Sequence, residues 1–273
     1  MRRTVDDRLV VVAIDEVGGL PGGILVRGPS DLRTIGLAPG MTMAPTVGGW
    51  AVPAVGLSID GGSAVPWSPM LPAAARRAVT AWDPRRTAEA RSVAAGLAHV
   101  GSLASGRWAT DDPWSTTIAA IVRRLVIDLT YDAGGAATRD AVGMIGMGRG
   151  LTPAADDVLV GLLAGLDALD HPQRAKIAAA VTAAAPTRTT SVAAATIAHA
   201  ARGAYSEWLH DVLVASGAPH GAGDPLPAAI ARALSFGATS GGDTLVGLFA
   251  AMDVAAARAE RGARAARGAR VAA

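Results

Sequence analysis

A glycine-rich segment followed by an apolar run occurs twice in this 273-residue chain, some eighty residues apart. The first copy, residues 146–167, reads GMGRGLTPAADDVLVGLLAGLD, and the second, residues 237–253, reads GATSGGDTLVGLFAAMD. Alignment of the two copies gives the pairs Asp157 and Asp243, Leu159 and Leu245, Val160 and Val246, Gly161 and Gly247, Leu162 and Leu248, Ala164 and Ala250, and Asp167 and Asp253. In both copies a Thr precedes a carboxylate and an apolar run, which predicts the start of a helix.

The repeat predicts a paired anion site. A helix N-terminus preceded by glycines presents unpaired N–H groups and the positive end of the helix dipole, which favour a phosphate or carboxylate. Ordinary capping would explain one motif, but it requires no run of glycines, so the glycines indicate close approach of a ligand or of a neighbouring helix. The ligand-binding residues expected on these grounds are Gly146, Gly148, Arg149, Gly150, Thr152, Thr239, Ser240 and Gly241.

The acidic residues of the two motifs are the candidate catalytic groups. Asp156, Asp157 and Asp243 stand just inside the expected helix starts. They can orient the N–H groups of the loops, act on a proton, or hold a magnesium ion. The sequence leaves their role open, and magnesium is the one cofactor that it suggests.

At these residues the chain resembles the AllH family, long catalogued as a domain of unknown function. The motifs that carry the resemblance are GMGRGLTPAADDVLVG and GATSGGDTLVG, together with a Thr pair followed by an Ala and a Gly, and a weaker echo in VPWSP. The Thr pair corresponds to Thr189 and Thr190, which the resemblance adds to the ligand-binding residues. The resemblance spans about residues 140–255.

The resemblance implies a subunit of oxamate carbamoyltransferase, a transferase of purine degradation. Such a subunit would act on oxamate or a similar small amide with carbamoyl phosphate, in contact with other carbamoyltransferase subunits. The chain departs from the family pattern at four alanines, where the family usually has Ser-Gly, a Ser and a His: Ala154, Ala155, Ala193 and Ala238. A non-catalytic assembly or binding subunit is therefore the alternative, and a magnesium-dependent hydrolase is a further one.

Composition and local patterns predict an α+β fold. Turn clusters separate short β-like runs at Leu9–Ile14, Gly23–Val26 and Trp50–Ile59, which predicts a small β-rich part over residues 1–70. Helical periodicity then dominates, so a larger, mainly helical part over residues 71–257 is expected to pack against it. One helix is expected to begin after Asp112 and Pro113, and one long helix to carry the stripe from Ile197 to Ala215.

Charge and targeting signals favour a cytoplasmic protein with small-molecule substrates. The chain has no Cys, which is compatible with a reducing compartment, and its apolar runs are shorter than the ~20 residues that span a bilayer. Residues 258–273 form a basic segment that is expected to be a flexible tail. Neither nucleic acid nor a membrane is expected as a partner, and the five histidines show no metal-ligand spacing.

Overall fold

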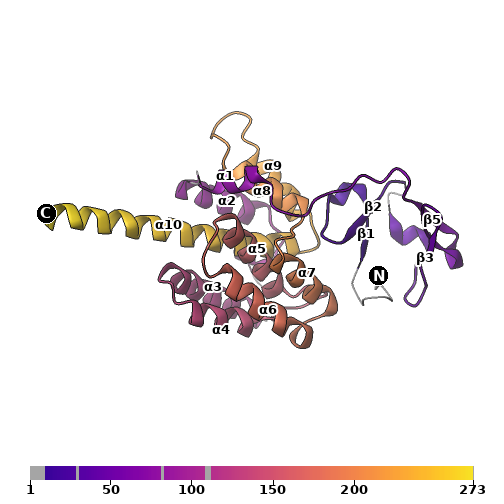
Figure 1. The fold of residues 1–273 in the computed structure, drawn as a ribbon, viewed down its shortest axis with the longest axis horizontal. Helices are drawn as coiled ribbons and strands as arrows, with labels where there is room; N and C mark the ends of the chain where they lie inside the picture. Colours follow the sequence, from indigo (N-terminus) through magenta and orange to yellow (C-terminus); the bar gives the residue numbers. More distant parts are fainter. Residues whose placement is uncertain (1–9, 29–30, 81–82, 108–111, 273) are drawn as a thin grey trace. The chain divides into compact units, whose positions relative to one another are not determined.

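The computed structural model describes residues 10–28, 31–80, 83–107 and 112–272, and it confirms the α+β class. The chain divides into two compact units, residues 1–69 and residues 70–273 (Figure 1). The described strands that form sheets lie in the first unit, and the second unit is helical. No helix among the described residues is both long and apolar enough to cross a membrane.

The N-terminal unit contains two small sheets. Strands β1 (Val11–Ile14) and β2 (Gly23–Val26) pair in parallel, with Val11 opposite Gly23. Strands β3 (Ala44–Thr46), β4 (Gly49–Val52) and β5 (Leu57–Asp60) form an antiparallel sheet in that order. Three short 3-10 helices connect the strands: η1 (Asp15–Val17), η2 (Leu32–Ile35) and η3 (Pro53–Val55).

The prediction of one continuous β-like run over Trp50–Ile59 is wrong, because the structure has two strands there. Pro53 fixes its own φ and lacks an N–H for the ladder, and it begins η3. Gly56 has φ +64°, a left-handed conformation that reverses the chain direction. The chain therefore turns between β4 and β5, which pair with each other.

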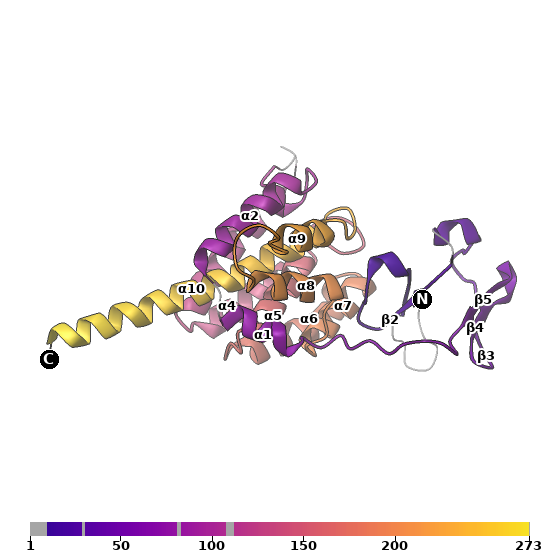
Figure 2. The ribbon, with the colours of Figure 1, turned by 90° about the horizontal axis from the view of Figure 1, so that it is seen from above.

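Ten helices and one 3-10 helix make up the described part of the second unit (Figures 1 and 2). They are α1 (Ala73–Thr80), α2 (Pro84–Leu97), η4 (Leu103–Ser105), α3 (Ser115–Thr130), α4 (Gly134–Met144), α5 (Ala154–Ala168), α6 (Arg174–Arg188), α7 (Ser191–Ala201), α8 (Glu207–Ser216), α9 (Leu226–Leu234) and α10 (Ser240–Ala272). Helix α5 is apolar on nearly all sides and is almost entirely buried, as expected of a central helix.

The two copies of the repeat form α5 and α10, which pack together more extensively than any other pair of elements. Both helices begin at the aligned positions Ala154 and Ser240. A Cβ at Gly161 would lie 1.8 Å from the carbonyl oxygen of Thr244, and a Cβ at Gly247 would lie 1.9 Å from that of Val158. Since Val158 and Thr244 are themselves aligned, the two contacts are reciprocal. The helices run parallel, with their N-termini at the same end.

Helix α3 follows the predicted pattern. The carboxylate of Asp112 accepts hydrogen bonds from the Trp114 N–H and the Ser115 hydroxyl at the start of the helix. The apolar stripe of this helix is buried at Ile118, Ile121, Val122, Leu125 and Leu129, and Val126 is partly buried.

The prediction of a single long helix from Ile197 to Ala215 is wrong, because the structure has two helices there. The chain leaves α7 after Ala201, turns at Gly203 with φ +80°, and enters α8 at Glu207. A side chain at Gly203 would be strained in this conformation. The apolar spacing continues across the turn because both helices bury a face in the same core.

Residues 258–272, for which a flexible tail was expected, continue α10 as a helix. Beyond the other helices of the unit, this end of α10 projects alone (Figures 1 and 2). Its first turns still contact the end of α3: Arg258 forms an ion pair with Asp132, and Arg261 lies 4.4 Å from the ring centre of Tyr131.

Candidate binding and catalytic site

The two glycine-rich loops meet at the N-terminal ends of α5 and α10. The hydroxyls of Thr152 and Ser240 lie 2.8 Å apart and share a hydrogen bond. These residues are 88 positions apart in the chain, and each comes from one copy of the repeat. The structure thus brings together the two motifs for which the repeat predicts a paired anion site.

The aligned carboxylates Asp157 and Asp243 lie on the faces by which α5 and α10 contact each other. Asp157, Gly161 and Gly165 follow each other at intervals of four residues on α5, and Asp243 and Gly247 follow the same spacing on α10. Residues four apart share one helix face. Both carboxylates are consequently buried, and Asp243 has no exposed surface.

Asp243 is anchored by the segment around η4. Its Oδ1 accepts a hydrogen bond from the Leu103 N–H at 2.7 Å and another from the Ser102 hydroxyl at 3.0 Å. Its Oδ2 is buried and has no hydrogen-bond partner among the described residues. Burial raises the pKa of Asp243 to about 6, against the opposing effect of the Leu103 N–H and of the nearby Thr239 and Ser102 hydroxyls.

Ser102 and Leu103 are site residues that the sequence analysis missed. They lie 141 and 140 residues before Asp243. The segment around them, GSLASG, carries no charged or metal-binding residue, so only its Gly and Ser content marks it as a turn.

Asp157 is the second buried carboxylate with an unused oxygen. Its Oδ2 also has no hydrogen-bond partner among the described residues. Burial raises the pKa of Asp157 well above its usual value, while the hydroxyls of Ser240 and Thr152 lower it and the charge of Asp243 raises it further. Two carboxylates so close together disfavour simultaneous ionisation.

Asp156 and the Thr pair hold the first glycine-rich loop in place. The carboxylate of Asp156 accepts a hydrogen bond from the Gly146 N–H at 2.9 Å and one from the Thr189 hydroxyl. The Thr190 hydroxyl donates to the carbonyl of Leu151 at 2.5 Å and accepts from the N–H of Ala193 at the start of α7. Burial raises the pKa of Asp156, and the two hydrogen bonds oppose this effect. The Asp156 carboxylate thus ties the first glycine-rich loop to the segment that precedes α7.

The backbone N–H groups at the two helix starts are partly used within the chain. The Ala155 N–H donates to the carbonyl of Met147, and the Gly241 N–H donates to that of Phe236. Among the described residues, no hydrogen bond involves the N–H groups of Ala154 and Ser240, the aligned first residues of α5 and α10. Both residues are partly exposed. These two groups are therefore available for a backbone contribution to anion binding.

Three glycines of the first loop have positive φ: Gly146 (+80°), Gly148 (+126°) and Gly150 (+92°). A Cβ at Gly148 would lie 2.5 Å from the backbone nitrogen of Ala154, and one at Gly146 would lie 2.3 Å from the carbonyl oxygen of Arg188. Gly150 faces open space, because nothing lies within 4 Å of its Cβ position. The first two glycines thus permit close backbone contacts, and the third permits the turn.

The remaining predicted residues lie around the same loops. Gly241 packs against α9, since a Cβ there would lie 1.7 Å from the Ala233 carbonyl oxygen. Thr239 accepts a backbone hydrogen bond from Asp243 at the start of α10. Arg149 is exposed. Hydrogen bonds from Ser115 and Trp114 lower the pKa of Asp112, and the positive charge of Arg149 lowers it further. Within the described ranges, no group of three or more His, Cys, Asp or Glu side chains could hold a metal ion.

In the comparison with known proteins, one family model matches the part of the chain that holds the two glycine-rich loops and the helices after them. Residues 144–252 match a family model described as oxamate carbamoyltransferase subunit AllH. The resemblance seen in the sequence is confirmed. Comparisons with curated proteins and with solved structures gave no match. The AllH segment runs from the last residue of α4 into α10, so it includes Asp156, Asp157 and Asp243. Ser102 and Leu103, which hold Asp243, lie outside it.

Proposed function

We propose that the chain is a subunit of a cytoplasmic carbamoyltransferase and binds its small substrates at the joined N-terminal ends of α5 and α10. The observation that carries this proposal is the pair of buried, unused carboxylate oxygens, Oδ2 of Asp157 and Oδ2 of Asp243, beside the hydroxyl contact of Thr152 and Ser240. A buried polar atom without a partner costs free energy, and binding a ligand would recover that cost. The family description of the AllH segment supports this class of enzyme.

The two carboxyl groups suit an amide substrate. Ionised carboxylate oxygens accept hydrogen bonds from N–H groups, and a protonated carboxyl donates to a carbonyl oxygen. Oxamate and the carbamoyl group each contain N–H groups and a carbonyl oxygen. The N–H groups of Ala154 and Ser240 and the nearby cation Arg149 are available for the phosphate or carboxylate ends of the substrates.

Carbamoyl transfer forms one bond and breaks another. The amide nitrogen of the acceptor attacks the carbonyl carbon of carbamoyl phosphate, the bond from that carbon to oxygen breaks, and phosphate leaves with the electron pair. The attacking nitrogen loses a proton. Asp243, with a pKa of about 6, is mostly ionised at pH 7 and is assigned the role of base. Asp157, whose pKa lies well above its usual value, is assigned the role of hydrogen-bond donor to the carbonyl oxygen.

Titration calorimetry with oxamate and with carbamoyl phosphate, combined with an assay of oxamate-dependent phosphate release, tests the proposal. We expect the Asp243→Asn variant to retain binding within a few-fold and to lose about 100-fold or more in turnover. The Asp157→Asn variant should weaken the binding of both ligands. Asp140→Asn is the matched control and should change neither quantity, because Asp140 is a partly exposed residue that pairs with Arg124. No binding of either ligand by the folded chain would reject the proposal.

An assembly subunit without chemistry of its own is the second candidate. It is favoured by three alanines at positions where the family usually has a Ser, a Ser and a His, so that no hydroxyl or imidazole is present there: Ala154, Ala193 and Ala238. In that case the tagged chain would bind the ligands alone but release phosphate only when subunits that copurify with it are present. Turnover by the chain alone would reject this candidate.

A further inference from the structure

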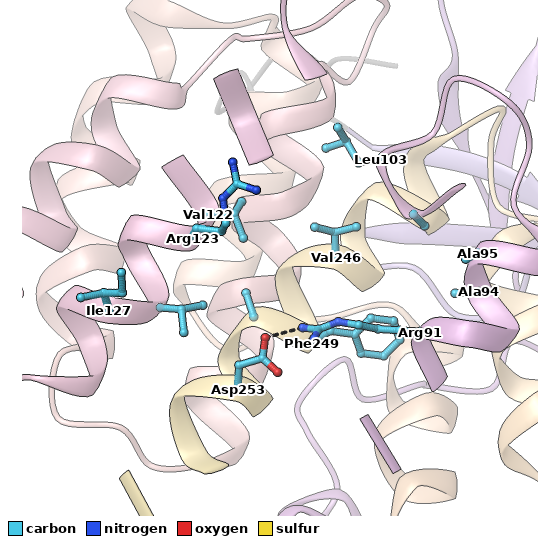
Figure 3. A pocket seen from close by; sticks show the side chains of 13 residues that line it. Arg91, Ala94, Ala95, Leu103, Val122, Arg123, Ile127, Val246, Phe249 and Asp253 are labelled. Carbon is cyan, nitrogen blue, oxygen red and sulfur yellow. Dashed lines mark hydrogen bonds and ion pairs between the residues drawn. The ribbon is translucent and has the colours of Figure 1, made fainter. Parts of the chain in front are cut away.

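A pocket of about 620 Å³ lies between α2, η4, α3 and α10 (Figure 3). Apolar side chains form most of its wall: Ala94, Ala95, Leu103, Val122, Val126 and Phe249 are among them. The volume falls within the range of about 300–1,000 Å³ that is typical of small-molecule sites.

The pocket shares Leu103, whose N–H holds Asp243, with the candidate site but is otherwise lined by different residues. Val246, Phe249 and Asp253 line it from one face of α10, whereas Asp243 and Gly247 lie on the face toward α5. It also contains no residue of the two glycine-rich loops. An inference about the pocket therefore stands without the proposed carbamoyltransferase function.

Three charged side chains border the apolar wall. Arg91 forms an ion pair with Asp253 and lies over the ring of Phe249, 5.8 Å from its centre (Figure 3). Arg123, on α3, makes no hydrogen bond or ion pair with the described residues. Because Asp253 neutralises Arg91, the lining carries one uncompensated positive charge, that of Arg123.

We propose that this pocket binds a small organic monoanion, a carboxylate with a compact hydrocarbon body. Its carboxylate would pair with the guanidinium of Arg123, which offers two parallel N–H donors to such a group. Its hydrocarbon part would cover the side chains of Ile127, which is 57% exposed, and of Val126 and Val246, which are partly exposed. The single free positive charge sets the preference for a monoanion over a neutral or cationic analogue.

Calorimetry and thermal-shift measurements with three six-carbon probes test the proposal: hexanoate, hexanol and hexylamine. We expect hexanoate to bind at least 10-fold more tightly than hexanol, and hexylamine not to bind. The Arg123→Gln variant should lose about 10-fold or more in hexanoate affinity and should no longer distinguish hexanoate from hexanol. Arg124→Gln is the matched control, since the neighbouring Arg124 pairs with Asp140 and does not line the pocket.

A second variant tests the location. Ala95→Phe would fill the pocket from α2 and should abolish hexanoate binding, while circular dichroism checks that the helices remain. Hexanoate binding that survives in folded Ala95→Phe or in Arg123→Gln would overturn the proposal. Equal binding of hexanoate and hexanol, or binding of none of the three probes, would overturn it as well.

Discussion

Gly161 of α5 and Thr244 of α10 stand so close that a Cβ at Gly161 would lie 1.8 Å from the Thr244 carbonyl oxygen. In the aligned pair, a Cβ at Gly247 would lie 1.9 Å from the carbonyl oxygen of Val158. Each copy of the repeat therefore supplies a glycine that admits the backbone of the other copy. This contact holds the helices parallel and brings Asp157 and Asp243 to the same end.

The Gly161→Ala and Gly247→Ala variants should each lower the free energy of unfolding by about 3 kcal/mol or more. The added methyl group meets backbone atoms, which cannot rotate away, so the two helices must separate. Urea denaturation followed by circular dichroism measures the change. Gly262→Ala, in the exposed part of the same helix with no atom near its Cβ position, should instead stabilise the chain by about 0.5–1 kcal/mol.

Wild-type stability should fall with rising pH between about pH 4 and pH 6 because of Asp243. Its folded pKa of about 6 exceeds the ordinary value of 3.8, so the folded state holds the proton more tightly than the unfolded state does. The stabilisation is complete below the unfolded pKa and is lost as pH rises through the folded pKa. The difference between 3.8 and about 6 corresponds to about 3 kcal/mol.

The Asp243→Asn variant isolates this contribution, because an amide of the same shape has no proton to lose in this range. We expect the unfolding free energy of the wild type, relative to that of the variant, to decrease from pH 4 to pH 6.5. Urea titrations at several pH values measure the difference. Parallel stability curves for the two proteins would contradict the raised pKa of Asp243.

The hydrogen bond between Thr152 and Ser240 should contribute about 0.5–1 kcal/mol of coupling free energy. A double-mutant cycle with Thr152→Val and Ser240→Ala measures it, and the double variant should lose less stability than the two single variants together. The Thr187→Val substitution replaces a hydroxyl that bonds only within its own helix turn, to Ala184. When Thr187→Val is combined with Ser240→Ala, the losses in the free energy of unfolding should be additive. Additive losses for Thr152→Val and Ser240→Ala would contradict a hydrogen bond between the loops.

Local patterns in the sequence were sufficient to predict the helix starts at Ala154 and Ser240 and the buried stripe of α3, because caps and periodicity involve only neighbouring residues. The repeat also indicated that the two glycine-rich loops meet. The anchoring of Asp243 by Leu103 was not predictable, since a backbone N–H donor has no sequence signature. The break at Gly203 was missed because one core buries the faces of both α7 and α8 and so hides the turn from apolar spacing.

The structure also resolves the role of several glycines that the sequence left ambiguous. Gly161, Gly247 and Gly241 permit helices to approach each other, whereas Gly148 lies beside the open N–H of Ala154. One residue type thus permits both helix packing and a close backbone contact within the loop of the same motif. Spacing alone cannot separate these roles, because both require the absence of a Cβ.

The end of α10 should contribute to stability only as far as Arg261. The Arg261 guanidinium donates a hydrogen bond to the Thr130 carbonyl at the end of α3 and lies against the ring of Tyr131. Truncation after Arg258 removes both contacts and should lower the free energy of unfolding by about 1–2 kcal/mol. Truncation after Ala263 keeps both contacts of Arg261 and removes Arg264, whose ion pair with Glu260 is exposed. The free energy of unfolding should therefore fall by less than about 0.5 kcal/mol. Urea denaturation of the two truncated chains and of full-length Arg261→Ala measures these differences. Equal stability of the two truncated chains would show that the contact with α3 contributes nothing, as a flexible tail would require.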